Sequence, residues 1–174
     1  MPTVESRGSR GRVLLVDADW QDSVSRAEGL LLGGWEVDIA TSVEAATATI
    51  DRGTPDAIIT SEHLSGPFDG RELARRLKRD ASTQHLPILV LTDASDEDLD
   101  EKHAKILSCG TYLAKPCDVI AVVAALEGEI ALAALLASRR ARREGREAQL
   151  PANIRSARIR DVGGAHLLTG SDQF

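Results

Sequence analysis

Side chains that could do chemistry follow four apolar segments of this 174-residue chain. They offer carboxylates, hydroxyls and one ammonium group. If they converge at one place, such groups would suit a site that handles a phosphoryl group and a divalent cation. The residues are Asp17, Ala18 and Asp19, then Ser61 and Glu62, then Thr92 and Asp93, and finally Lys115 and Pro116.

Five short apolar segments, rich in Val, Ile and Leu, predict strands that are buried on both faces. They cover residues 12–17, 35–40, 56–61, 87–92 and 111–115. Between them, helical patterns cover residues 20–33, 43–52, 69–80 and 95–108, and a fifth begins after Asp118. Ser42 and Asp69 offer side chains that can cap two of these helices.

This alternation predicts an α/β fold, a doubly wound parallel sheet with helices on both faces. In such sheets ligands bind outside the carboxyl ends of the strands. Because the polar residues named above follow those ends, we expect them to lie together at one edge of the sheet.

The order and spacing of several short motifs make the chain resemble the receiver domain of bacterial response regulators over residues 12–131. The motifs are Val13 to Asp17, Pro55-Asp56, Asp69-Gly70, Leu91-Thr92 and Tyr112 to Pro116. The resemblance implies the flavodoxin-like (βα)5 fold with strand order 2-1-3-4-5. It also implies two-component signalling, in which a histidine kinase passes a phosphoryl group to an aspartate after the third strand.

Two departures from the family pattern affect that chemistry. The family has a second acidic residue after the first strand, which binds magnesium, but here Asp17 is followed by Ala18. Counting forward from Pro55-Asp56, the phosphoacceptor position falls on Ser61, a poor nucleophile; counting back from Asp69-Gly70, it falls on Glu62. We favour Ser61, because loops accept insertions more readily than strands. We therefore expect no metal, no cofactor and no catalytic role.

The resemblance also implies roles for the remaining residues. Thr92 would bind a phosphoryl oxygen, Tyr112 would turn inward, and Lys115 would pair with the acceptor before a cis peptide to Pro116. Without an acceptor carboxylate, we expect Lys115 to pair with Asp17, and Asp19 and Glu62 are further candidates. In the alternative, Glu62 lies in the pocket as a permanent negative charge and holds the domain in an active-like state.

The fifth helix is predicted to continue beyond the domain, to about residue 149. An apolar seam along it would need a partner, and a homodimer is the simplest one; the alternative is that the extension folds back on its own domain. Glu127 and Glu129 interrupt the apolar stretch and argue against membrane insertion. The seam consists of Leu126, Ile130, Ala133 and Ala137.

Charge is unevenly distributed along the chain, whose net charge is −6. Residues 138–174 hold eight arginines and four acidic residues, so they carry +4 and the remainder carries −10. The arginines at the helix end complement the helix dipole, and nucleic-acid binding is the alternative interpretation. That basic cluster consists of Arg139, Arg140, Arg142, Arg143 and Arg146.

The two cysteines, Cys109 and Cys117, form no metal or disulfide motif and predict a reduced, cytoplasmic setting. We expect residues 1–11 to be a disordered lead, residues 132–149 to extend the fifth helix and residues 150–174 to be loosely ordered. The function predicted first is a phosphorylation-independent pseudo-receiver that binds itself or another signalling protein. The alternatives are a receiver regulated through Ser61 modification or a ligand, and a nucleic-acid-associated regulator.

Overall fold

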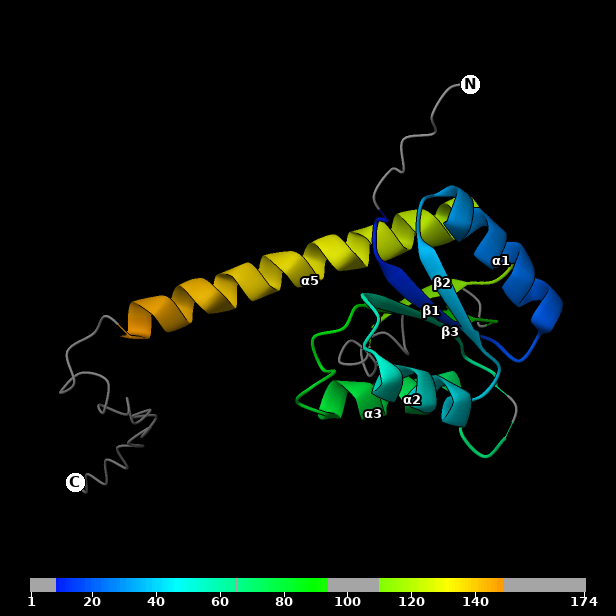
Figure 1. Cartoon of the computed structure of the whole chain (residues 1–174), viewed down its shortest axis with the longest axis horizontal. Coiled ribbons are helices and arrows are strands. Elements are labelled where there is room, and N and C mark those ends of the chain that lie inside the picture. Colours follow the sequence, from blue (N-terminus) through cyan, green and yellow to red (C-terminus); the bar gives the residue numbers. More distant parts are fainter. Residues whose placement is uncertain (1–8, 65, 94–109, 149–174) are drawn as a thin grey trace, which may run out of the picture. The chain divides into compact units, whose positions relative to one another are not determined.

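A five-stranded parallel sheet forms the centre of the domain (Figure 1). The computed structural model of the chain describes residues 9–64, 66–93 and 110–148. The strand order is β2-β1-β3-β4-β5, which confirms the predicted topology. The strands are β1 (Arg12–Val16), β2 (Glu36–Ala40), β3 (Ala57–Ser61), β4 (Ile88–Thr92) and β5 (Thr111–Ala114).

Four helices are described, and each begins within one residue of the predicted start. Ser42 and Asp69 cap α2 and α3 as expected, because their side chains accept hydrogen bonds from the backbone N–H of Ala45 and Glu72. The helix predicted over residues 95–108 and the tail predicted over residues 150–174 lie outside the described residues, as do the first eight residues of the lead predicted over residues 1–11. The helices are α1 (Trp20–Leu32), α2 (Val43–Arg52), α3 (Gly70–Arg79) and α5 (Val119–Ala148).

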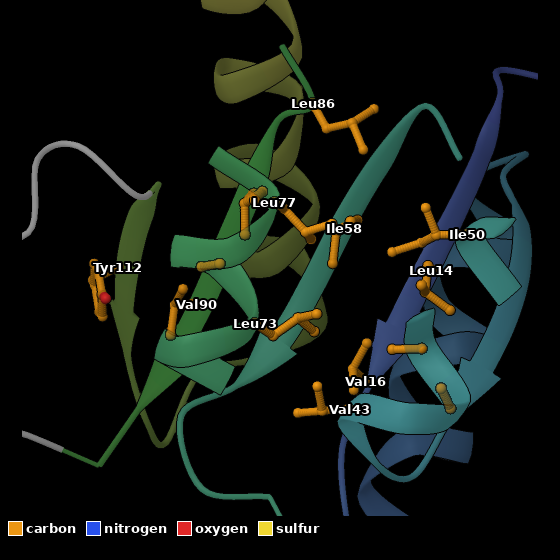
Figure 2. Packing of buried hydrophobic residues seen from close by; sticks show 14 residues of the cluster. Leu14, Val16, Val43, Ile50, Ile58, Leu73, Leu77, Leu86, Val90 and Tyr112 are labelled. Carbon is orange, nitrogen blue, oxygen red and sulfur yellow. The ribbon is translucent and has the colours of Figure 1, made fainter. Parts of the chain in front are cut away.

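The core has two layers, one on each face of the sheet. On one face, α2 and α3 pack against the strands through residues such as Ile50, Leu73 and Ile58, all buried (Figure 2). On the other face, α1 and the first part of α5 bury Leu30, Leu126 and their neighbours. The central strands β3 and β4 are buried along their whole length, as their continuous apolar sequence predicts.

The apolar side chains of α5 that pack on the core lie near its start, and exposed leucines follow farther along the helix. Leu126 is fully buried in the domain core and Ile130 packs against that core. The prediction that Leu126 faces a partner is therefore wrong, because its side chain is already enclosed by its own domain. By contrast, Leu132, Leu135 and Leu136 are 48%, 50% and 55% exposed.

By length and composition alone, α5 could cross a membrane between Val119 and Gly145, a test that core helices of water-soluble proteins also pass.

The chain divides into two compact units, Met1–Leu136 and Ala137–Phe174. In the second unit, Arg139, Arg140, Arg142 and Arg143 are exposed, and Arg140 pairs with Glu144 at 2.9 Å.

Candidate functional site

The predicted site residues follow the carboxyl ends of four neighbouring strands. Strand register aligns Val16 with Thr60, Ser61 with Leu91 and Thr92 with Ala114. The residues that follow these positions therefore come together at one edge of the sheet, as predicted. We call this edge the rim, made up of Asp17, Ser61, Glu62, Thr92 and Lys115 together with the two arginines, Arg26 and Arg71, that contact them.

Ser61 and Lys115 form the centre of the rim. The ammonium Nζ of Lys115 donates a hydrogen bond to Ser61 Oγ at 2.8 Å, and it lies 3.9 Å from Asp17 Oδ2. Ser61 is 2% exposed at the end of a strand that is paired on both sides. The Lys115-Pro116 peptide is cis, as the resemblance implied. The backbone N–H of Lys115 donates to the carbonyl of Thr92 at 2.7 Å, which fixes the start of its side chain.

Asp17 is buried, and both of its carboxylate oxygens have donors. Oδ1 accepts from the backbone N–H of Asp19 at 3.1 Å, and Oδ2 lies 3.0 Å from the Arg26 guanidinium. Arg26 also reaches Asp22 at 3.1 Å, one helical turn earlier on α1. Asp17 therefore already has a guanidinium and a backbone amide as partners, with the Lys115 ammonium close by.

Glu62 occupies the other half of the rim and is 5% exposed. Thr92 Oγ1 donates a hydrogen bond to its carboxylate, and Arg71 Nη1 lies 3.1 Å from Oε1. Its backbone is also held, because its N–H donates to the carbonyl of Leu91 and its carbonyl accepts from Gly70. The carboxylate thus connects the ends of β3 and β4 to the start of α3.

Gly70 allows α3 to begin this close to β3. A Cβ atom at this position would lie 1.9 Å from the carbonyl oxygen of Ser61 and 2.6 Å from Thr60 Oγ1. No side chain fits at such distances, so a glycine is required where the helix meets the strand end.

Comparison with known proteins agrees with this geometry. The sequence model described as "Response regulator receiver domain" matches residues 13–127. This chain belongs to the response regulator receiver family. The phosphate regulon transcriptional regulatory protein PhoB of Pseudomonas aeruginosa is 34% identical over 115 residues, which are 66% of this chain and 49% of that protein.

Two further relatives are similar over the same region. Transcriptional regulatory protein TrcR of Mycobacterium tuberculosis is 32% identical over 121 residues, 70% of this chain and 46% of that protein. The receiver chain thus spans about half the length of these curated relatives. A putative response regulator structure from Chloroflexus aurantiacus has 33% identity and a TM-score of 0.62, with 70% of this chain and 98% of that chain covered.

The receiver rim differs from the sequence-based expectation at two acidic residues. Asp19 was a candidate partner for Lys115, but its carboxylate instead caps α1 by accepting from the N–H groups of Gln21 and Asp22. Glu62, the other candidate, contacts Thr92 and Arg71. The predicted approach of Lys115 to Asp17 is present at 3.9 Å, but the shorter contact of Lys115 is with Ser61.

The other predicted residues take simpler positions. Ala18 and Pro116 are exposed, and Tyr112 is buried in the core cluster that also holds residues of α3, turned inward as the resemblance implied. Asp93 is exposed and lies 4.0 Å from the His63 imidazole. Burial raises the pKa of the Cys117 thiol, against the opposing effect of the Arg26 and Lys115 charges.

Sequence reasoning missed Arg26 and Arg71, the two guanidinium groups of the rim. The only sequence signal for Arg26 is its spacing of four residues from Asp22, which is common on exposed helices. Arg71 follows the motif Asp69-Gly70 directly and reaches back to both Asp69 and Glu62.

A separate hollow of about 240 Å³ opens beside the start of α3 and is lined by Leu64, Pro67, Phe68, Glu72 and Arg75, among others. None of the rim side chains lines it. We place the chemistry of the molecule at the rim and not in this hollow, because the strand-end residues Ser61, Thr92 and Lys115 lie at the rim and none of them lines the hollow. Among the described residues, no group of three or more His, Cys, Asp or Glu side chains could hold a metal ion.

Proposed function

We propose that this receiver works without phosphorylation, as a protein interaction module in two-component signalling. The observation that carries the proposal is the 2.8 Å hydrogen bond from Lys115 Nζ to Ser61 Oγ. It supports Ser61 as the residue in the acceptor position, because the receiver resemblance pairs this lysine with the acceptor. A serine there has a hydroxyl where acyl-phosphate chemistry needs a carboxylate.

The surroundings of Ser61 also support this proposal. A serine becomes a nucleophile when an adjacent base accepts its proton. The contact made by Ser61 is with an ammonium group, which donates to the hydroxyl oxygen and cannot remove its proton. Ser61 is also only 2% exposed, so a modifying enzyme would have to open the strand end to reach it.

The residues present do not fit the divalent cation that receiver chemistry uses. Ala18 offers a methyl group where the family has a ligand, and Ser61 offers a hydroxyl in place of a carboxylate. Asp17 is the one carboxylate left of that ligand set, and it is already paired with Arg26. Magnesium prefers several oxygen ligands in near-octahedral geometry, which this set does not provide.

Glu62 supplies a permanent charge in the same region. Its carboxylate accepts a hydrogen bond from Thr92, the residue that would bind a phosphoryl oxygen in the family. Arg71 compensates the charge at 3.1 Å. We therefore propose that Thr92 is held by an internal carboxylate and that the conformation of the rim does not depend on an incoming phosphoryl group.

Mass spectrometry of the intact protein tests this function. The full chain is incubated with a small phosphodonor and magnesium, beside a receiver that has an acceptor aspartate as a positive control. We expect the control to gain one phosphoryl group and this chain to keep its mass. A phosphoryl group that maps to Ser61 or Glu62 would overturn the proposal.

We also propose that the interaction partner of α5 includes a second copy of the chain. Three half-exposed leucines, Leu132, Leu135 and Leu136, follow the part of α5 that packs on the core. Leucines at spacings of three and four residues are typical of helices that pair through apolar contacts. These leucines replace Leu126 as the residues that would carry the contact.

Light scattering of the full chain tests self-association. Replacing the three leucines with glutamine should convert a concentration-dependent dimer into a monomer. Ile120→Gln is the matched control, because Ile120 is 75% exposed on the same helix but lies at its start. A wild-type chain that is monomeric at every concentration, or a dimer that survives the triple replacement, would exclude this surface.

A further inference from the structure

Arg26 is a nearly buried cation at the point where α1 passes the rim. Its side chain is 12% exposed, and its two terminal nitrogens contact two different carboxylates, Asp17 at 3.0 Å and Asp22 at 3.1 Å. The position of Arg26 follows from the start of α1. The side chain of Asp19 caps this helix, and the backbone N–H of Asp19 donates a hydrogen bond to Asp17 Oδ1. The helix is thus fixed to the rim about two turns before Arg26.

The two carboxylates that Arg26 contacts are not equivalent. The Asp17 side chain is 4% exposed, whereas that of Asp22 is 55% exposed. A buried carboxylate requires a compensating charge, while an exposed one is stabilised by water. The pair with Asp17 is therefore the one that determines the electrostatics of the rim.

Lys115 adds a second positive charge near the same atom, since its Nζ lies 3.9 Å from Asp17 Oδ2. A divalent cation bound to that oxygen would have a guanidinium and an ammonium as its neighbours. Like charges at such distances oppose each other strongly. A metal ion at Asp17 Oδ2 would therefore compete with Arg26 for that oxygen.

We infer that Arg26 is a built-in substitute for the divalent cation of receiver chemistry, and that it excludes magnesium from the rim independently of the missing ligands. This inference rests on the proposed function, which already assumes that the ligand set is incomplete. It adds that restoring the ligands alone does not restore the metal site. Arg26 is thus a residue that determines ion specificity by occupying a carboxylate.

Magnesium titration by calorimetry of four full-length chains tests the inference. They are the wild type, the ligand-restored chain Ala18→Asp with Ser61→Asp, and each of these with Arg26→Gln. In the restored background, Arg26→Gln should tighten magnesium binding by at least about tenfold. The reason is that a nearby like charge changes the equilibrium constant of an ionic site by about one logarithmic unit or more. The same affinity with and without Arg26 would overturn the inference.

Two further variants in the restored background serve as controls. Arg71→Gln removes the other guanidinium of the rim, which contacts Glu62 and not Asp17. It should leave magnesium affinity within about threefold, because its guanidinium pairs with Glu62 and its side chain is 33% exposed, so that solvent screens its charge. A gain equal to that of Arg26→Gln would show that any lost positive charge suffices, and would also overturn the assignment.

Arg26→Lys keeps a positive charge but loses the two-nitrogen contact with Asp17 and Asp22. It should bind magnesium more weakly than Arg26→Gln, which separates exclusion by charge from a general loosening of the rim. Tight magnesium binding by this variant would contradict the inference. The failures of the two proposals are distinguishable. Phosphoryl transfer to the wild-type chain would remove the proposed function, whereas an inert wild type with no effect of Arg26 would remove only this inference.

Discussion

The rim and the part of α5 around Leu132, Leu135 and Leu136 differ in how their side chains are accommodated. At the rim, the charged groups lie within 4 Å of partners from their own domain, as the contacts of Asp17, Glu62 and Lys115 show. Along α5, three leucines remain about half exposed in sequence positions where a helix would normally pack against something. Under the proposed function, this receiver binds its partners through this surface of α5 and not through the rim.

The physical reason lies in the cost of burying charge. A carboxylate that leaves water needs a cation and hydrogen-bond donors, and the chain supplies both at the rim. An external ion would then have to displace partners that are already held by folding. Apolar surface on a helix has no such internal solution, so a second copy or another protein is its natural partner.

Removing Asp17 would break the rim most severely. Asp17→Ala leaves Arg26 and Lys115 without their shared carboxylate, and the free energy of unfolding should fall by about 3 kcal/mol. Asp22→Ala is the matched control, because Asp22 contacts the same arginine but is exposed, and it should cost less than about 1 kcal/mol. Urea denaturation measures both. Equal losses would contradict the claim that burial gives the Asp17 pair its importance.

Two glycines sharpen the contrast between the tight rim and the open helix. Gly70→Ala places a methyl group 1.9 Å from the Ser61 carbonyl oxygen, and should lower the free energy of unfolding by about 2 kcal/mol. Gly128→Ala meets nothing within 4 Å on α5 and should raise it by up to about 1 kcal/mol, because alanine favours the helix. Thermal unfolding of the two variants should shift in opposite directions. A stabilising effect of Gly70→Ala would refute the close approach of α3 to β3.

The sequence predicted the fold of the described residues closely, for a physical reason. Strands buried on both faces must be continuously apolar, so their limits are visible in the sequence, and β1 ended one residue before the predicted position because Asp17 already turns to the rim. The caps Ser42 and Asp69 were visible because only short polar side chains can bind the first N–H groups of a helix.

The site was predicted only in part. The positions of Ser61, Thr92 and Lys115 follow from strand ends, which the pattern defines. Arg26 and Arg71 could not be predicted, because a long side chain on a helix can extend into solvent or toward the sheet, and tertiary packing decides between them. For the same reason Asp19 was misassigned, since capping of its own helix competes with pairing to Lys115.

The smallest expected effect concerns the hydrogen bond between Thr92 and Glu62. Thr92→Val keeps the shape of the side chain but removes the donor, and should lower the free energy of unfolding by about 1 to 2 kcal/mol. Thr47→Val is the control, since its hydroxyl donates to a carbonyl of its own helix at 2.8 Å and contributes little. Urea denaturation of the two variants should separate them by about 1 kcal/mol. An equal change would indicate that Glu62 does not depend on Thr92.

A crystal structure of the full chain in magnesium and a beryllofluoride mimic of the phosphoryl group tests the central claim most directly. We expect Lys115 to stay hydrogen-bonded to Ser61 and Arg26 to stay paired with Asp17, and we expect neither the metal nor the mimic to bind at the rim. A magnesium ion coordinated by Asp17, with the mimic attached to Ser61 or Glu62, would contradict this claim.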